Sequence, residues 1–488
     1  MISIDYAGAS HLIRRMGFGA PPEDIDALVA LGSREAAVDY LLNYDKIDDK
    51  ALDDLITANF QLDEVPLDNT KFNPQELRRL WFTRMILTKR QFQEKLTLFW
   101  HNHFATAISK VNQEVLMQAQ NNTLRANALA RFDDLLLKVA EEPAMLVYLD
   151  TLQNVRGNTN ENFARELQEL FTMGIYDVVT GEANYTQTDI TEIARTFTGW
   201  NFTRPPANTP FNYTFRLVAA SHDNSSKTIY QGTPFARTAN LDGADVISII
   251  SSRPSTPRFL VKKFFEFFVY PLDFSKKADR DTADRLATVY LNNDHSIKEF
   301  VRAIFTSDEF WSDRAMYGLI KTPPEFIVGP IRMLGATYNA GGPVAQRDNS
   351  IYQRSALLGM DLFNPLDVSG WDLNSAWINT ASMLDRYNVA NALAITRAAN
   401  PTTQQGAFLT TDQLRKYTKA TTKKTVKGFL SVLNVSADKP TINSFRNYLD
   451  TGDDGVSQPF DPSTDAVIDK KIRGLVHLIM CLPEFQLN

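Results

Sequence analysis

The sequence is poor in features that mark several protein classes. It contains one cysteine, Cys481, which excludes internal disulfides and cysteine-only metal clusters. It has no apolar run of about eighteen residues, so no segment is expected to span a bilayer. Lysine and arginine number 51 against 57 acidic residues, and no basic block gathers phosphates. Nucleic acid is therefore not expected as a main partner.

Common catalytic signatures are missing as well. The sequence has no Gly-x-x-x-x-Gly-Lys-Ser/Thr, Gly-x-Gly-x-x-Gly, Gly-x-Ser-x-Gly or His-Glu-x-x-His motif. This disfavours the usual nucleotide-binding, α/β-hydrolase and zincin mechanisms but leaves an unusual enzyme open. Residues Met1–Tyr6 show no secretory signal, which predicts a cytoplasmic protein unless the chain is a mature exported form.

What the sequence does contain is helical periodicity over most of its 488 residues. We predict a mainly α fold, a multi-helix array with a small β-hairpin insertion near 201–235. The insertion is indicated by prolines, asparagines and two β-type runs at 213–218 and 227–230. The length of the chain predicts about three domain-sized units. These are an N-terminal helical region (1–150), a motif-bearing helix pair with the insertion (151–240) and a C-terminal helical region (241–488), forming one continuous body.

Two local signals frame the central helix pair. Gly174 is expected to end the first helix, as glycine does at helix C-termini. Thr186–Asp189 has the spacing of a capping box and should begin the second helix, whose apolar face runs to Trp200.

The segment Trp100–Phe104 offers two histidines, His101 and His103. In a helix, positions two apart lie about 200° round the axis, so the two rings cannot act together. Helical phase places His103 on the apolar side and His101 opposite. A hydrogen-bonded core histidine is the favoured interpretation of His103, and a metal or catalytic role is the alternative.

The segment 160–170 is an amphipathic helix with Glu161, Arg165 and Glu169 spaced four residues apart on one face. We expect a solvated ion-pair face. If the face instead lines a cleft, its carboxylates, with Glu166 and the Arg165 guanidinium, could bind a cation or act as acid and base.

Two further segments carry chemistry. His222-Asp223 with Lys227 lies in the expected insertion and is either a polar turn or part of a triad-like site. Trp371 and Trp377 flank a proline- and glycine-containing loop, which could equally form a ligand-binding wall or fill the core.

These segments together resemble a known bacterial family, the domain-of-unknown-function 1800 family. The resemblance rests on His11–Gly19, Lys95–Thr106 (KLTLFWHNHFAT), Asn160–Gly174, Tyr185–Trp200 (YTQTDITEIARTFTGW), His222-Asp223 with Lys227-Thr228, and Pro483–Gln486. The chain departs from the family pattern at Leu366-Asp367 and at Asp372–Asn374. The resemblance implies that the polar motifs form a shared site, and that relatives are exported or envelope-associated. The family has no established activity, so it implies no reaction.

Three hypotheses follow. The first, which we favour, is a non-catalytic helical scaffold or binding protein for a protein partner or a surface polymer. The alternative is a hydrolase-type enzyme, with or without a bound divalent metal. The third is a small-ligand binding protein that uses the tryptophan loop. The candidate catalytic residues are His103, Arg165, Glu166, His222 and Asp223; the ligand-binding candidates are Trp200, Lys227, Trp371 and Trp377; and the metal candidates are His101, His103 and His222.

Overall fold

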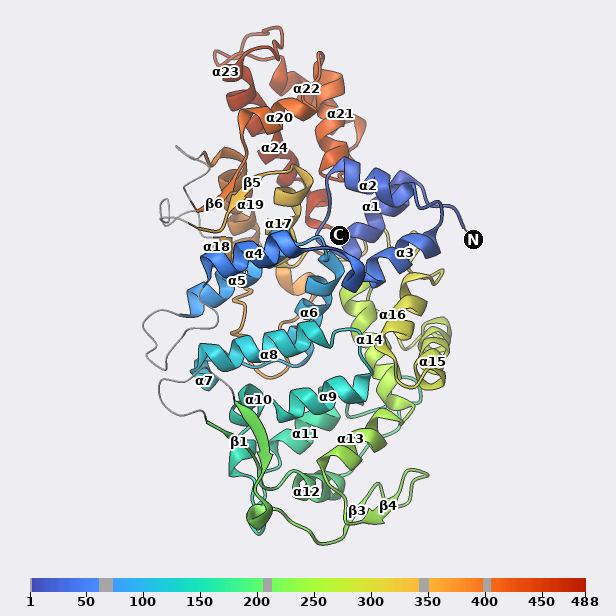
Figure 1. The fold of residues 1–488 in the computed structure, drawn as a ribbon. Helices are drawn as coiled ribbons and strands as arrows, with labels where there is room; N and C mark the ends of the chain where they lie inside the picture. The colour runs from blue at the N-terminus through green and yellow to red at the C-terminus, as the bar shows by residue number, and fades with distance from the viewer. Residues whose placement is uncertain (1, 61–72, 205–212, 342–350, 398–404) are drawn as a thin grey trace.

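The computed structural model describes residues 2–60, 73–204, 213–341, 351–397 and 405–488. The first half of the chain forms a helical array (Figure 1). Its helices are α1 (Tyr6–Arg15), α2 (Pro22–Val29), α3 (Arg34–Leu42), α4 (Lys50–Asn59), α5 (Pro74–Leu87), α6 (Gln91–His103), α7 (Ile108–Val111), α8 (Glu114–Ala126), α9 (Phe132–Glu141), α10 (Pro143–Tyr148), α11 (Asn162–Glu169) and α12 (Gln187–Thr196).

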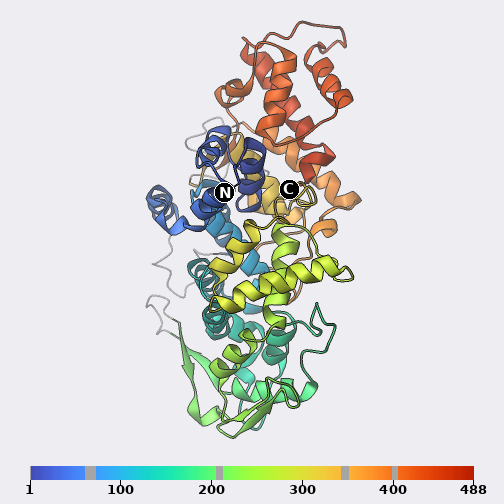
Figure 2. The ribbon, with the colours of Figure 1, turned by 90° about the vertical axis from the view of Figure 1, so that its right-hand side faces the viewer.

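The second half continues the helical array and ends in a cluster of short helices. The helices are α13 (Gly243–Ser251), α14 (Ser255–Phe268), α15 (Lys277–Asn292), α16 (Ile297–Phe305), α17 (Pro323–Met333), α18 (Ile351–Leu357), α19 (Thr380–Ile395), α20 (Thr411–Tyr417), α21 (Thr422–Val432), α22 (Lys439–Leu449), α23 (Asp465–Val467) and α24 (Arg473–Met480). The molecule is elongated, with α20–α24 at one end and α12 with the first four strands at the other (Figures 1 and 2). The predicted mainly α fold is confirmed.

Strands are few in the described part of the chain and form three two-stranded antiparallel sheets. They are β1 (Trp200–Thr203) with β2 (Thr214–Leu217), β3 (Lys227–Ile229) with β4 (Arg237–Ala239), and β5 (Thr337–Asn339) with β6 (Gly406–Phe408). The insertion therefore holds two hairpins, and its two β-type runs pair with other segments instead of each other. Residues 205–212 of the insertion lie outside the described residues.

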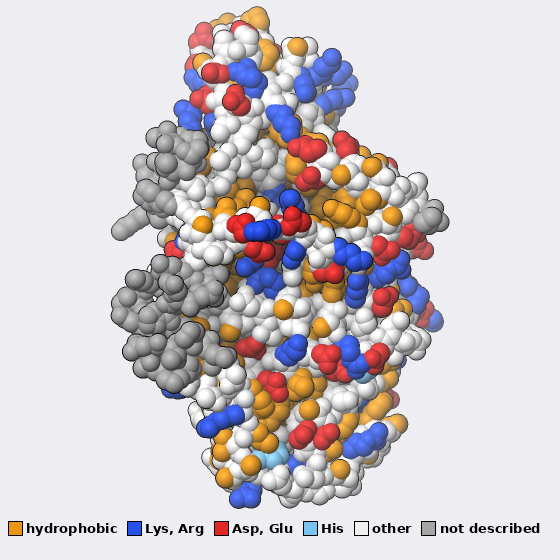
Figure 3. Space-filling view, in the orientation of Figure 1, with side chains coloured by type: hydrophobic (Ala, Val, Ile, Leu, Met, Phe, Trp, Pro, Cys, Tyr) orange, Lys and Arg blue, Asp and Glu red, His pale blue; other side chains and the backbone are white. Residues whose placement is uncertain are grey.

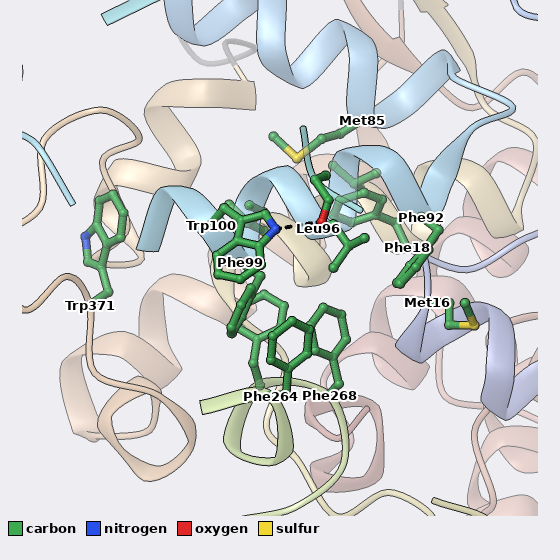
Figure 4. Close-up of a cluster of buried hydrophobic side chains, with 14 of the residues drawn as sticks. Met16, Phe18, Met85, Phe92, Leu96, Phe99, Trp100, Phe264, Phe268 and Trp371 are labelled. Carbon is green, nitrogen blue, oxygen red and sulfur yellow. Dashed lines mark hydrogen bonds between the residues drawn. The ribbon is translucent and has the colours of Figure 1, made fainter. Parts of the chain in front are cut away.

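One hydrophobic core runs through all three sequence regions, from Ile4 to Phe485. At its centre, phenylalanines of α6 and α14 interleave, and the Phe99 and Phe264 rings lie 4.2 Å apart (Figure 4). A second, small cluster beneath α4 and α5 consists of Leu52, Ile56, Phe60, Leu80 and Ala340. The shared core is consistent with the predicted single continuous body. The boundaries between the three regions, near residues 150 and 240, stay predictions.

The two local signals of the central helix pair have different outcomes. Thr186 and Asp189 form the predicted capping box at the start of α12. Gly174 has the expected positive φ of 75°, but α11 ends earlier, at Glu169. The backbone amides of Met173 and Gly174 both donate to the carbonyl of Gln168, which turns the chain away from the helix axis. The predicted helix end was therefore too late.

The surface carries charges of both signs. On the face drawn in Figure 3, acidic and basic side chains alternate over the described area without a large region of one sign. Among the described helices, none has the length and apolar character needed to cross a membrane.

Candidate functional site

The C-terminal end of α6 is where three distant segments meet. His101 accepts a hydrogen bond at Nε2 from the backbone amide of Phe363, at 3.1 Å. Asn102 accepts one at Oδ1 from the amide of Trp371, at 2.6 Å. His103 donates from Nε2 to the carbonyl of Phe171, at 2.9 Å. Three consecutive polar side chains thus fix the loop 363–373 and the chain after α11 to one helix end.

The structure corrects the expectation that His101 lies on a polar side of its helix. His101 is 1% exposed and His103 is 7% exposed, because other elements cover α6 on every side. Burial lowers the pKa of both histidines to about 3, and for His103 the positive charge of Lys263 adds to the effect. Both rings are therefore neutral at physiological pH. The prediction that His103 is a buried, hydrogen-bonded core histidine is confirmed.

The two neutral rings hold their protons differently. The His101 ring accepts at Nε2, so its proton is on Nδ1. The His103 ring donates from Nε2, so its Nδ1 carries a lone pair, and this buried atom has no partner among the described residues. A neutral imidazole with a free lone pair is able to accept a hydrogen bond or to bind a metal ion.

The loop 363–373 passes α6 in direct contact at Gly370. Its φ is +85°, and a Cβ atom there would lie 2.3 Å from Asn102 Oδ1 and 2.4 Å from the Asn102 carbonyl. Only glycine fits this position without displacing the Asn102 bonds that hold Trp371. The course of the loop is thus set by its fit to the helix end.

Two cavities flank this loop and share Ser369, Trp371 and Asp372. The inner cavity, about 130 Å³, lies between α6, α14 and the loop. Its lining also includes Phe99, Asn102, His103, Leu170, Lys263, Glu266, Phe267 and Leu373. The outer cavity, about 380 Å³, lies between the loop, α18 and the start of α19. Its lining includes Leu357, Leu366, Asp367, Trp377, Ser382 and Asp385.

The two tryptophans predicted to bind ligand both reach this place. Trp371 borders both cavities and Trp377 borders the outer one, each 6% exposed. Figure 4 shows Trp371 apart from the phenylalanine cluster, beyond the end of α6. The indole Nε1 of Trp377 is buried and has no partner among the described residues.

The acidic helix α11 lies beside the same loop. Burial raises the pKa of Glu166, and the negative charges of Glu169 and Asp367 raise it further, which places Glu166 within electrostatic reach of the loop. Arg165 pairs with Glu161 at 3.3 Å and keeps 39% of its side chain exposed. Glu169 instead accepts a hydrogen bond from Tyr185, at 3.4 Å. The structure therefore contains the expected ion pair of Arg165 with Glu161, while Glu169 bonds to Tyr185 in place of Arg165.

The remaining predicted residues form a second cluster around the first hairpin. His222 donates from Nδ1 to the carbonyl of Thr198, at 2.8 Å. Asp223 pairs with Arg195 at 2.7 Å, and this bond holds the pKa of the carboxyl well below its usual range. Lys227 donates to the carbonyl of Asp223, at 2.5 Å.

Trp200 packs on Phe197 in the same cluster, with ring centroids 4.8 Å apart. Within the described parts of the chain, no hydrogen bond or ion pair joins this cluster to His103. The two are linked through α12, which carries Arg195 and also contacts α11. The structure thus gathers His101, His103, Glu166, Trp371 and Trp377 at one loop.

The described residues contain no group of three or more His, Cys, Asp or Glu side chains placed to hold a metal ion. The metal site at His101, His103 or His222 stays a prediction. Sequence reasoning missed Asn102, Lys263, Glu266 and Asp385. Asn102 stands between the two histidines and could have been noticed there. Lys263 and Glu266 lie on α14 among many phenylalanines, and the sequence pattern there indicates a helix but gives no signal of a site.

Comparison with known proteins gives a family without a described activity. The sequence model of the family described as protein of unknown function (DUF1800) matches residues 11–487. The search of curated proteins and the search of solved structures return no match.

Proposed function

We propose that this chain, which belongs to the DUF1800 family of proteins of unknown function, is a non-catalytic binding protein that takes up a segment of a protein partner. The binding surface is the outer cavity beside the loop 363–373, with the apolar and acidic side chains at its rim. The helical array serves to present this loop in a fixed course.

The observation that carries the proposal is a gathering of exposed aliphatic side chains at this cavity. Leu366, at the outer bend of the loop, is 95% exposed, and Leu357 on the opposite wall is 67% exposed. Leu384, which is next to the lining residue Asp385 on α19 but is not itself part of the lining, is 61% exposed. Single exposed leucines are ordinary, but several around one concave surface are typical of protein-binding sites.

Charge at the rim indicates the kind of partner. Asp367, Asp372 and Asp385 border the cavity, and none of the lining residues that the structure describes is basic. Complementary charge across an interface favours the correct partner and speeds its association. The structure therefore favours a peptide segment with an aliphatic or aromatic anchor next to lysine or arginine.

Several of the candidate catalytic, metal and ligand-binding residues support a structural role more than a reaction. His101 and His222 each use a ring nitrogen to hold backbone of a distant or adjoining segment. Asp223 pairs with Arg195, and Lys227 donates a hydrogen bond to the carbonyl of Asp223. Buried polar groups of this kind are costly to remove, which accounts for their presence without chemistry.

The test is selection from a displayed library of random peptides of about twelve residues, a length that can fill a groove with several anchors. We expect enriched peptides that combine an apolar anchor with basic residues. Leu366→Ser should weaken their binding about tenfold or more, as loss of an apolar anchor does, and Asp385→Asn should weaken it less. Leu366 is too exposed for this change to disturb folding.

Val456→Ser is the matched control, since Val456 is an exposed aliphatic residue (62%) outside the cavity lining. It should leave peptide binding unchanged. Absence of any enriched peptide, or binding that Leu366→Ser does not weaken, would overturn the proposal. Binding of polysaccharides in place of peptides, lost in the same variant, would replace the protein partner with a surface polymer.

A further inference from the structure

The inner cavity is lined by charged side chains that form no direct pair with one another. Lys263 is partly buried on α14, and within the described residues its ammonium group makes no hydrogen bond or ion pair; it lies 5.6 Å from the centroid of the Phe259 ring. Glu266, which is partly exposed, and Asp372, which is exposed, also line the cavity, and their carboxylates make no hydrogen bond or ion pair in the described structure. The Nδ1 atom of His103 is buried and has no hydrogen-bond partner there.

This arrangement is unusual because Lys263 and Glu266 are well placed to satisfy each other. They lie three residues apart on α14, so they share one face of the helix. Both border the same cavity, yet they form no ion pair. Elsewhere in the molecule, residues at this spacing do pair, as Arg195 and Glu192 do at 2.8 Å. Separated opposite charges at one cavity are suited to a ligand that carries both charges itself.

The walls of the cavity define the rest of the ligand. Phe99, Phe267 and Trp371 supply aromatic surface, and Leu170 and Leu373 supply aliphatic surface. A volume of about 130 Å³ is roughly four times the share of one water molecule in the liquid, so a ligand must be small. Aromatic rings with nearby carboxylates also favour an ammonium group.

We propose that the inner cavity binds a small zwitterion of the α-amino acid class. The ligand carboxylate pairs with Lys263, its ammonium group pairs with Glu266 and Asp372, and its side chain packs on Phe267 and Trp371. Hydrogen bonds between ionised groups are stronger than neutral ones, so these pairs provide the recognition. This site lies on the other side of the loop 363–373 from the peptide surface proposed above and shares Trp371 and Asp372 with it, but the proposal does not depend on peptide binding.

The experiment uses the full-length protein and isothermal titration with three sets of probes. The first set is the common α-amino acids, and the second is the corresponding amines without a carboxylate. The third set is neutral polyols of similar size. All are tested to about 10 mM, because ligands with few atoms bind weakly. We expect at least one apolar amino acid to bind, its amine to bind about tenfold more weakly, and the polyols not to bind.

Variants then assign the contacts. Lys263→Gln should reduce amino acid affinity about tenfold while leaving amine affinity unchanged, since it removes the carboxylate partner alone. Glu266→Gln should weaken both. Lys262→Gln is the matched control, because Lys262 is the neighbouring lysine on α14 and is not part of the lining. Circular dichroism checks that each variant is folded.

Three results would overturn the proposal. The first is absence of amino acid binding to the folded wild-type protein. The second is amino acid binding that Lys263→Gln and Glu266→Gln leave unchanged. The third is binding of polyols in place of amino acids, which would assign the cavity to a different ligand class. None of these results bears on peptide binding at Leu366, so the two proposals fail or survive independently.

Discussion

Replacing one partner of the buried Lys95–Glu325 ion pair should destabilise the protein more than replacing both partners. Lys95 is fully buried and Glu325 is 5% exposed. The Lys95 ammonium group donates to Glu325 and also to the carbonyl of Gly17, at 2.9 Å. Glu325 accepts further hydrogen bonds from the amide of Thr322, at 2.7 Å, and from Asn488 Nδ2, at 2.8 Å. The pair therefore ties the central helix to α17 and to both ends of the chain.

The magnitude follows from what each variant leaves behind. Lys95→Met leaves a buried carboxylate and Glu325→Leu leaves a buried ammonium group, and either loss should cost about 3–5 kcal/mol. Unfolding entropy of about 2.1 cal/mol/K per residue gives about 1.0 kcal/mol/K for 488 residues. Each single variant should then lower Tm by about 3–5 °C. The double variant leaves neither member of this pair alone and should recover part of this loss. Recovery is incomplete because the buried cations Arg15, Lys321 and Arg386 also lose the nearby charge of Glu325.

The assay is thermal unfolding followed by circular dichroism at one scan rate, because a chain of this size can unfold irreversibly. An exposed pair, Lys50 with Asp54 (side chains 74% and 64% exposed), is the control, and Lys50→Met should shift Tm by less than about 1 °C. If the Lys95→Met and Glu325→Leu shifts simply add in the double variant, the two groups are not energetically coupled and the argument is refuted.

Three further predictions concern the end of α6. His103→Ala should lower stability by about 2–4 kcal/mol, because it leaves a cavity and an unpaired Phe171 carbonyl; an unchanged Tm would contradict this. Gly370→Ala should release the loop from Asn102 and speed its cleavage in limited proteolysis, and cleavage at the wild-type rate would contradict the close contact. Acid should destabilise the protein: with folded pKa values of about 3 for His101 and His103, the unfolded chain binds protons first as pH falls below 6.5. Between the folded and the unfolded pKa, each histidine then lowers the free energy of unfolding by up to about 1.4 kcal/mol per pH unit. Tm should therefore fall from pH 6.5 to 4.5, and it should fall less steeply in His101→Gln. An equal slope in that variant would refute the assignment.

Local patterns in the sequence predicted the local parts of the fold. The capping box at Thr186 is encoded within a few residues, and it is present. The pairing of β5 with β6 joins residues about seventy positions apart, and three-residue strands carry too little pattern to indicate a partner. The two hairpins of the insertion were merged into one for the same reason.

The burial of His101 shows a different limit. Helical phase places it opposite the apolar face, which is correct for an isolated helix packed on one side. Here the opposite side is covered by Phe363 and Trp371, from a loop more than 250 residues away. Periodicity within α6 contains no information about that loop. The candidate site was therefore predictable as a set of segments, while the contacts that assemble it were not.

The polar residues discussed above are of two kinds, those with hydrogen-bond partners in the protein and those without. The second kind indicates where function should be sought. His101, Asn102, His222 and Asp223 have partners, and their specific hydrogen bonds account for them as parts of the framework. Most buried polar groups in proteins are satisfied in this way. Lys263 and Glu266 border a cavity, are partly exposed, and form no hydrogen bond or ion pair through their side chains within the described residues. A framework role does not explain their place at this cavity. They are therefore the residues whose replacement should change binding while leaving the fold intact, whereas His103 also holds the Phe171 carbonyl and contributes to the fold.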